Sequence, residues 1–277
     1  GLDSFNVAVI DTGFHFNLLD PSRPASTEAY LQVAQNASAP VLTFTFVYGS
    51  GSQYWSTEAR NALQDSAALL ATYLVVSSPT AVVYTVTGEN APASGTLASA
   101  GSDLSAPGSG FFATVVQKKI QTGVDANGAA ADGEITWNFG NPWEFGTTVD
   151  TSQYDFESTA MHELLHTFGF LSFVDRAGTN TGRSWTTFDQ YLVTADGTRV
   201  ITDSYRWNTA YNSTLTGGLY FGGPGAVAVY GGVVPLYTPD PWESGSSVSH
   251  LDDDTFTGAN SMLMNAATDT GPGIRVI

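Results

Sequence analysis

The segment 155–169 dictates more of the fold than any other part of the sequence, because it reads as one amphipathic helix with a defined beginning and end. Asp155 is a suitable N-cap, and Gly169 can end the helix, since glycine readily adopts the left-handed conformation that follows many helices. Apolar residues recur between them at helical spacing, namely Met161, Leu164, Leu165 and Phe168. We therefore predict a helix over 156–168 that packs against a core.

The same segment carries the pattern H-E-x-x-H in His162, Glu163 and His166. Residues i and i+4 of a helix share one face, so the two imidazoles could bind one metal ion. Glu163 lies about 100° around the helix axis and could act as a general base on metal-activated water. With four histidines and eight glutamates in the chain, chance produces this pattern in about 0.002 of such sequences. We therefore expect a metal site on this helix.

One further metal ligand must come from outside the helix, because a catalytic zinc ion takes three protein ligands and leaves one position open. The chain contains no cysteine, and only His15 and His250 remain among its histidines. His15 precedes the whole expected sheet, whereas His250 stands 84 positions after His166 and shortly before a methionine-containing run. We expect His250 to be the third ligand, with a purely structural His250 as the alternative.

Runs of β-branched and aromatic residues predict a sheet in the first half of the chain. The strands are expected at Val41–Tyr48, Ala81–Thr87, Phe111–Val116 and Gly133–Trp137. Ser56 can cap a long helix between the first two strands, and Ser94–Gly110 has the composition of a surface loop. After Gly169 the sequence becomes rich in glycine, threonine and aromatic residues, and only short strands are expected, at Tyr191–Thr194, Ala226–Tyr230 and Gly232–Tyr237. A subdomain boundary is therefore expected near Gly169.

Charge and composition restrict the partners and the location of the protein. Acidic residues outnumber lysine and arginine by 26 to 9, and no basic stripe exists, which argues against nucleic acid and anionic lipid as partners. No apolar stretch of about 18 residues appears, so we expect no membrane insertion. Few lysines and abundant glycine, serine and threonine predict an exported bacterial protein, whose oligomeric state the sequence does not indicate.

The run HELLHTFGF, followed by a distant histidine and a methionine, resembles the metzincin zinc peptidases, whose pattern is H-E-x-x-H-x-x-G-x-x-H/D with a Met-turn. Gly169 matches the glycine of that pattern, but Ser172 stands where most metzincins have their third ligand. Leishmanolysin and its relatives instead have a long insertion before S-H and L-M-x-x-A. This chain is similar, with Ser249-His250 and the sequence LMNAA at 263–267.

Secreted bacterial metalloproteases with FD-x-x-L after the helix and SHLD before the Met-turn are similar too, and the chain has FDQYL at 188–192. The resemblance implies an α+β, metzincin-like fold with a cleft between two subdomains. The N-terminal subdomain, 1–169, would hold a twisted mixed sheet, a backing helix and the active-site helix, and 170–277 would form an irregular C-terminal subdomain. Gly133–Trp137 would be the edge strand that binds an extended substrate.

The function that the resemblance implies is that of a secreted zinc endopeptidase acting on proteins or peptides. Glu163 would be the general base, and the zinc ligands would be His162, His166 and His250. Met264 would underlie the histidines in the Met-turn, with Met262 as the alternative. A catalytically inactive, metal-stabilised surface or glycan-binding protein is the rival interpretation, and Glu163 counts against it because only catalysis needs that carboxylate.

The sequence also contains three weaker signals. Asp252–Asp254 could orient an imidazole through its second nitrogen, or could form a solvated acidic turn. The loop 125–134 could hold calcium, an expectation left unassigned because its spacing fails the EF-hand pattern; its oxygen-bearing residues are Asp125, Asn127, Asp132 and Glu134. D-T-G sequences at Asp11 and Asp269 are interpreted as turns, since the other motifs of aspartic and subtilisin-type proteases are missing.

Overall fold

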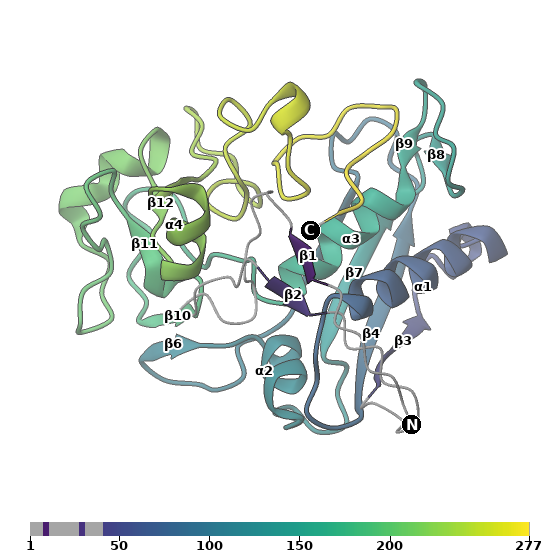
Figure 1. Ribbon diagram of the computed structural model, residues 1–277, viewed down its shortest axis with the longest axis horizontal. Coiled ribbons are helices and arrows are strands. Elements are labelled where there is room, and N and C mark those ends of the chain that lie inside the picture. The colour runs from purple at the N-terminus through teal and green to yellow at the C-terminus, as the bar shows by residue number, and fades with distance from the viewer. Residues whose placement is uncertain (1–7, 11–27, 31–40, 277) are drawn as a thin grey trace.

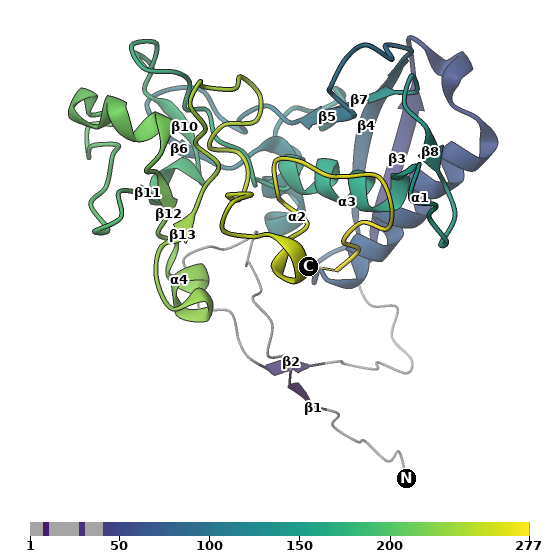
Figure 2. The same cartoon turned by 90° about the horizontal axis from the view of Figure 1, so that it is seen from above.

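The computed structural model describes residues 8–10, 28–30 and 41–276. Its central feature is a four-stranded sheet with the strand order β3-β4-β7-β5 (Figure 2). These strands are β3 (Leu42–Tyr48), β4 (Thr80–Glu89), β5 (Ala98–Gly101) and β7 (Gly133–Asn138). β3, β4 and β7 run parallel, whereas β5 is antiparallel to β7. The fold is therefore a mixture of helices and a mixed sheet, compatible with the expected α+β class.

One face of this sheet is buried by helices. Side chains alternate along β4, where Tyr84 is fully buried and Thr85 is exposed, as expected for a sheet covered on one side. Helices α1 (Thr57–Thr72) and α3 (Phe156–Thr167) lie together against the buried face (Figure 1). The hydroxyl of Ser56 accepts a hydrogen bond from the third residue of α1, which confirms its predicted role as N-cap.

Local interactions determine both ends of α3. The Asp155 carboxylate accepts a hydrogen bond from the Ser158 backbone N–H at 3.1 Å, so the predicted N-cap is confirmed. After the helix, Gly169 has φ +113°, and a Cβ there would lie 2.8 Å from a glutamine side chain. The Tyr84 and Thr167 hydroxyl groups form a 2.7 Å hydrogen bond that joins the end of α3 to the sheet. The sheet thus sets the position of the helix that carries the H-E-x-x-H pattern.

The other elements are short. The remaining α-helices are α2 (Val115–Thr122) and α4 (Pro224–Tyr230), and 3-10 turns occur at Ser52–Tyr54, Asp189–Tyr191, Thr209–Thr216 and Gly258–Asn260. Parallel pairs are formed by β6 (Gly110–Phe112) with β10 (Ser184–Thr186) and by β8 (Trp143–Glu144) with β9 (Tyr154–Asp155), and an antiparallel pair by β1 (Ala8–Ile10) with β2 (Glu28–Tyr30). A small antiparallel sheet contains β11 (Leu192–Val193), β12 (Tyr220–Phe221) and β13 (Val234–Pro235).

The C-terminal segment returns to α3. Figure 2 shows this segment, in yellow, crossing α3 between the main sheet and the part that contains β11 to β13. Arg275 binds the Asp155 carboxylate at the start of α3, with Nε to Oδ2 at 2.8 Å. One cluster of buried hydrophobic side chains includes residues before and after Gly169, among them Phe168 and Phe221. The division into 1–169 and 170–277 stays a prediction.

Two expected strands are wrong as placed. Ala226–Tyr230 belongs to α4, which begins at Pro224 and is followed by Gly231 with φ +87°. Proline at the start and glycine after the end are helix signals that the β-branched residues between them concealed. Phe111–Val116 is not a strand of the main sheet, because β6 pairs with β10 and α2 begins at Val115.

The expected edge strand is also wrong. β7, which contains Gly133–Trp137, lies inside the sheet between β4 and β5. The edge next to α3 is β5, within the segment Ser94–Gly110 that was expected to be a loop. Its sequence, ASAG, has little intrinsic preference for strand, so pairing with β7 rather than local propensity creates it.

His15 and the D-T-G sequence that begins at Asp11 lie outside the described residues, so the structure does not test the expectations for them. Within 8–10, 28–30 and 41–276, no helix combines the length and apolar character that crossing a bilayer requires.

Candidate metal centre

α3 directs three chemically active side chains toward one place. His162 and His166 are one helical turn apart, and Glu163 stands between them in the sequence. His166 and Glu163 are each 6% exposed, in keeping with a helix that is buried along most of its length. The predicted helix and the predicted arrangement of this motif on it are therefore both present.

His250 reaches the same place from a distant part of the chain. Its carbonyl accepts a hydrogen bond from the Tyr237 N–H at 2.9 Å, and the next N–H, of Leu251, donates to the Met264 carbonyl at 2.8 Å. His250 is thus held between two backbone segments and is 6% exposed. The structure brings together the two helical histidines and the third that the sequence analysis selected.

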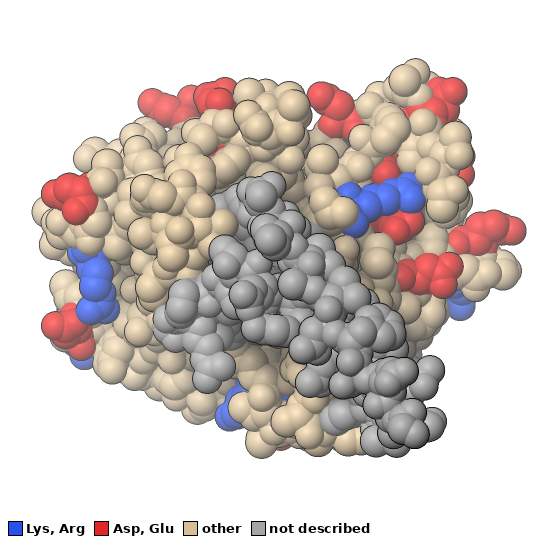
Figure 3. All heavy atoms as spheres, viewed as in Figure 1, with Lys and Arg blue, Asp and Glu red and all other residues tan. Residues whose placement is uncertain are grey.

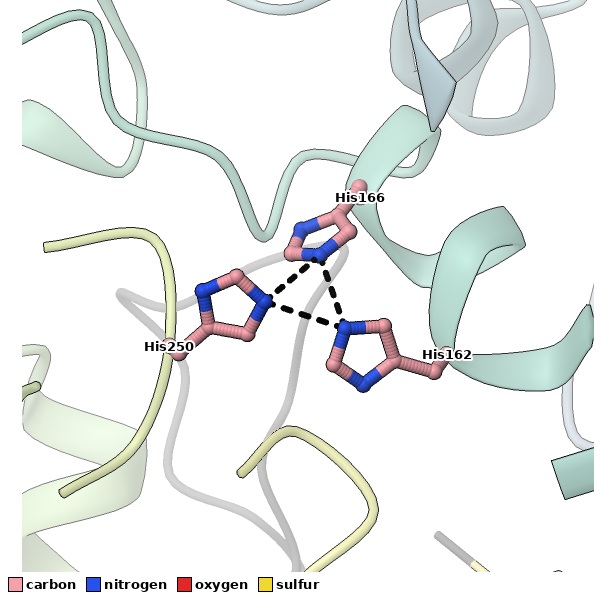
Figure 4. Close-up of side chains that lie close together, drawn as sticks. All are labelled: His162, His166 and His250. Carbon is pink, nitrogen blue, oxygen red and sulfur yellow. Dashed lines mark hydrogen bonds between the residues drawn. The ribbon is translucent and has the colours of Figure 1, made fainter. Parts of the chain in front are cut away.

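The three imidazoles converge through their Nε2 atoms (Figure 4). The Nε2 atom of His162 lies 3.0 Å from that of His166 and 3.0 Å from that of His250, and the third separation is 3.2 Å. Among the described residues, these three side chains form the group whose nitrogen atoms could hold a metal ion. Tetrahedral zinc with Zn–N distances of about 2.1 Å requires ligand separations of about 3.4 Å, so a small outward movement of the rings, by a few tenths of an ångström, would give the donor set that such an ion needs.

The opposite ring nitrogens determine which tautomer is present. Each Nδ1 atom lies close to one backbone carbonyl oxygen. The distances are 2.7 Å for His162 and Leu263, 2.7 Å for His166 and Phe170, and 2.8 Å for His250 and Ser246. A carbonyl oxygen accepts only, so each Nδ1 carries a proton and donates it. Each neutral ring then directs an Nε2 lone pair toward the other two, which is the arrangement that a cation requires.

Burial keeps these imidazoles neutral. Burial lowers the pKa of His162 below its usual value, and it lowers the pKa of His250 to about 3 with a further contribution from His162. For His166, burial and then the two neighbouring imidazoles hold the pKa well below its ordinary range. All three rings are therefore unprotonated at Nε2 at neutral pH and available as ligands.

Glu163 is placed beside this group in an apolar environment. Burial raises the pKa of the Glu163 carboxyl to about 8, while a hydrogen bond from the Ala100 backbone of β5 acts in the opposite direction. A carboxyl with such a pKa exchanges a proton readily near neutral pH, as a general acid or base must. The sequence predicted the carboxylate but not the strand that contacts it.

A cleft of about 940 Å³ contains the three histidines and Glu163. The edge strand β5 lies on one side, with Ala98 and Ala100 among the lining residues. The other walls come from 243–246 and from parts of 258–274. The histidine group is therefore accessible from a groove large enough for a peptide segment.

The loop around Met264 supports the group through its backbone. Met264 is 5% exposed and belongs to the core, whereas Met262 is half-buried and lines the cleft. The residue between them, Leu263, supplies the carbonyl that orients His162. Met264 as the apolar floor beneath the histidines stays a prediction.

Ser172, at the position where most metzincins have their third ligand, serves a structural purpose here. Its hydroxyl donates to the buried Asp189 carboxylate at 2.6 Å, and its N–H donates to the Ser249 hydroxyl at 3.1 Å. Asp189 also accepts hydrogen bonds from the backbone N–H groups of Phe173 and Thr186. These bonds connect the chain after α3 to the residue that precedes His250.

The acidic segments do not contact the imidazoles as one interpretation suggested. All three Nδ1 atoms use backbone carbonyls, so the alternative in which an aspartate among 252–254 orients a ring is wrong. The calcium expectation for 125–134 is not supported either, because the Lys119 ammonium group lies 2.9 Å from Asp125 and 3.0 Å from Asp132. The single Lys119 ammonium group thus pairs with both of these carboxylates.

Sequence reasoning missed the carbonyls of Phe170, Ser246 and Leu263, which no side-chain pattern reveals because every residue has a carbonyl.

Comparison of the chain with protein-family models, curated proteins and solved structures finds no match. The geometry of the cleft and the chemistry of its side chains are therefore the basis for its proposed function.

Proposed function

We propose that this protein is a zinc-dependent endopeptidase of the metzincin type. The observation that carries the proposal is the convergence of three neutral Nε2 atoms in the same cleft as the carboxyl group of Glu163. Zinc suits a set of three imidazoles, and when bound it supplies polarisation of a carbonyl group and a lower pKa for water. The cleft size and a free strand edge support a peptide as substrate.

In this proposal Glu163 moves the protons. Its carboxylate takes a proton from the attacking water and passes the same proton to the nitrogen of the departing amine, so one group serves as both base and acid. Its burial, 6% exposed, keeps bulk water away from the transferring proton. The Ala100 N–H beside it orients the carboxyl group toward the cleft.

β5 is the segment that would hold the substrate, in place of the β7 strand first expected. The Asn138 N–H donates to the Leu97 carbonyl at 3.0 Å, which makes these residues a hydrogen-bonded pair at the start of the β5–β7 ladder. Antiparallel pairs alternate, so Ala98 and Ala100 direct their N–H and C=O groups away from β7, on the cleft side. The Ala100 N–H already donates to Glu163, so an extended peptide could pair with the Ala98 N–H and with the C=O groups of Ala98 and Ala100, whose small side chains leave room for varied substrate sequences.

The test compares Glu163→Gln with the wild type after both have been loaded with zinc. We expect hydrolysis of a denatured, fluorescently labelled protein to fall by about 10²- to 10⁴-fold, because the proton carrier is removed. Zinc content, measured by mass spectrometry, should stay the same, since the ligands remain. Glu134→Gln, an exposed position on β7, is the matched control and should keep full activity.

Two outcomes would overturn the proposal. Unchanged hydrolysis by Glu163→Gln would refute the role of this carboxylate. A wild type that binds zinc stoichiometrically but cleaves no peptide would favour the inactive, metal-stabilised surface or glycan-binding protein. The further expectation of export rests on composition and is tested separately, by locating the protein in culture medium or in cells.

A further inference from the structure

The loop 262–267 determines how one of the three histidine rings is oriented. Its Leu263 carbonyl accepts the Nδ1 proton of His162 at 2.7 Å. A carbonyl that moved by even half an ångström would release or tilt that ring, because hydrogen bonds weaken steeply with distance and angle. The position of this loop is therefore part of the geometry of the histidine group.

Asp253 holds the loop from outside the cleft. Its Oδ1 accepts a hydrogen bond from the Ala266 N–H at 2.9 Å, and its Oδ2 accepts one from the Ala267 N–H at 3.0 Å. Both oxygens of one carboxylate thus bind two consecutive backbone amides. Hydrogen bonds to a charged acceptor are about twice as strong as neutral ones, so these two hydrogen bonds hold the loop strongly to Asp253.

The same aspartate lies three residues after His250, and the connecting chain is tied to the loop as well. The Leu251 N–H donates to the Met264 carbonyl at 2.8 Å. Two attachments, at Met264 and at Ala266–Ala267, therefore join the segment that carries His250 to the loop that orients His162, and both lie just after Leu263. A displacement of either segment changes the separation of the two Nε2 atoms, which is 3.0 Å.

The neighbouring aspartates do something different, which makes Asp253 the specific residue. The Asp252 carboxylate accepts from the Thr255 N–H at 3.0 Å and from its hydroxyl at 2.6 Å, so it closes a local turn. Asp254 is exposed. Burial and the charges of both neighbours raise the pKa of Asp253, so its surroundings disfavour a carboxylate there and the two loop amides offset that cost.

We propose that Asp253 is a positioning residue for the metal-binding group, acting through the 262–267 loop to keep the His162 ring directed at His250. Asp253 is not among the residues that line the cleft, so it would act through the loop. The inference rests on the metal site of the proposed function, but it does not require peptidase activity.

The experiment measures metal affinity in Asp253→Ala, Asp253→Asn and, as the matched control, Asp254→Asn. Zn²⁺ is titrated against a chromophoric chelator, and Co²⁺ is then used to record the visible absorption bands that report ligand geometry. Removing a partner that orients a ligand costs about 10- to 100-fold in metal affinity. We expect about 100-fold weaker binding for the alanine variant, about 10-fold for asparagine, which keeps one acceptor oxygen, and no change for Asp254→Asn.

The Co²⁺ bands should shift in both Asp253 variants, which a general loss of stability would not cause. Urea unfolding in the presence of a chelator shows which variants fold, and if alanine does not, the asparagine variant carries the test. Zn²⁺ affinity within twofold of the wild type, with unchanged Co²⁺ bands, would refute the role of Asp253 alone. A wild type that binds neither ion would instead refute the metal site itself.

Discussion

Replacing His250 with alanine separates the metal-binding role of this residue from its structural role. In the presence of a chelator the variant loses one buried imidazole, 6% exposed, together with its hydrogen bond to the Ser246 carbonyl. It also removes two of the three close approaches between Nε2 lone pairs, at 3.0 and 3.2 Å, which oppose one another without a cation. These changes partly cancel, so we expect a metal-free cost of about 1 kcal/mol.

The larger effect appears when zinc is added. A ligand that binds only the folded state stabilises it by RT ln(1 + [L]/Kd), which is about 4.1 kcal/mol at a thousandfold excess over Kd. Loss of one of three ligands should weaken binding by more than the roughly 100-fold seen for outer partners. At the same free zinc concentration the stabilisation of His250→Ala should therefore be smaller than that of the wild type by at least about 2.7 kcal/mol.

The assay is urea unfolding followed by tryptophan fluorescence, with free zinc held by a metal buffer or removed by a chelator. His15→Ala is the matched histidine control, and it should keep the full zinc-dependent increment because the three ligands remain. Equal increments for the wild type and His250→Ala would show that the distant histidine does not bind the ion. That result would refute the assembly of the site, whatever the peptidase assays give.

Three further predictions concern the support of the site, each measured as a free energy of unfolding in urea. Gly169→Ala should lose about 3 kcal/mol, because φ is +113° and the new Cβ meets a glutamine side chain at 2.8 Å, whereas Gly178→Ala, with φ +89° and open space, should lose only about 1 kcal/mol. Equal losses would remove the steric part of the argument. Burial raises the pKa of Asp189 to about 6, above its ordinary value of about 3.9, so its contribution to stability is greatest at low pH and falls as pH rises from about 4 to about 6, by about 3 kcal/mol. Asp189→Asn should lack this fall, and parallel stability curves from pH 4 to 8 would contradict it. Arg275→Ala leaves the Asp155 carboxylate, 3% exposed, without its cation and should cost about 3 kcal/mol, with Arg275→Lys intermediate; a loss below 0.5 kcal/mol would contradict this prediction.

Sequence reasoning succeeded where a local pattern and its chemistry agree. The caps at Ser56 and Asp155 and the turn at Gly169 are properties of single residues, and the structure has all three. The choice of His250 followed from counting the remaining histidines and from its place shortly before the methionine-containing run. Its hydrogen bonds to distant segments explain how it reaches α3.

Sequence reasoning failed where strand pairing, helix-end residues or backbone position decides the structure. β5 has the sequence ASAG and exists because β7 offers a partner, while Gly133–Trp137 has strong strand character and is nevertheless internal. In α4 the alternating valines indicated a strand, but Pro224 and Gly231 at its two ends decided for a helix. The carbonyls that orient the imidazoles belong to backbone whose position only the complete fold defines.

The short edge formed by β5 also has a consequence for self-association. A second chain can form hydrogen bonds with an unpaired strand edge and so extend the sheet, and many proteins aggregate in this way. Here the hydrogen-bonding groups on the cleft side belong to a strand of four residues, Ala98–Gly101, set within a groove beside α3. The chain has a net charge of −17, and Asp and Glu side chains lie at several places on the face seen in Figure 3. A flat partner sheet fits such a groove poorly, whereas a single extended strand fits it well, so the recess that we propose as a peptide site also disfavours pairing of this edge with a second copy of the chain.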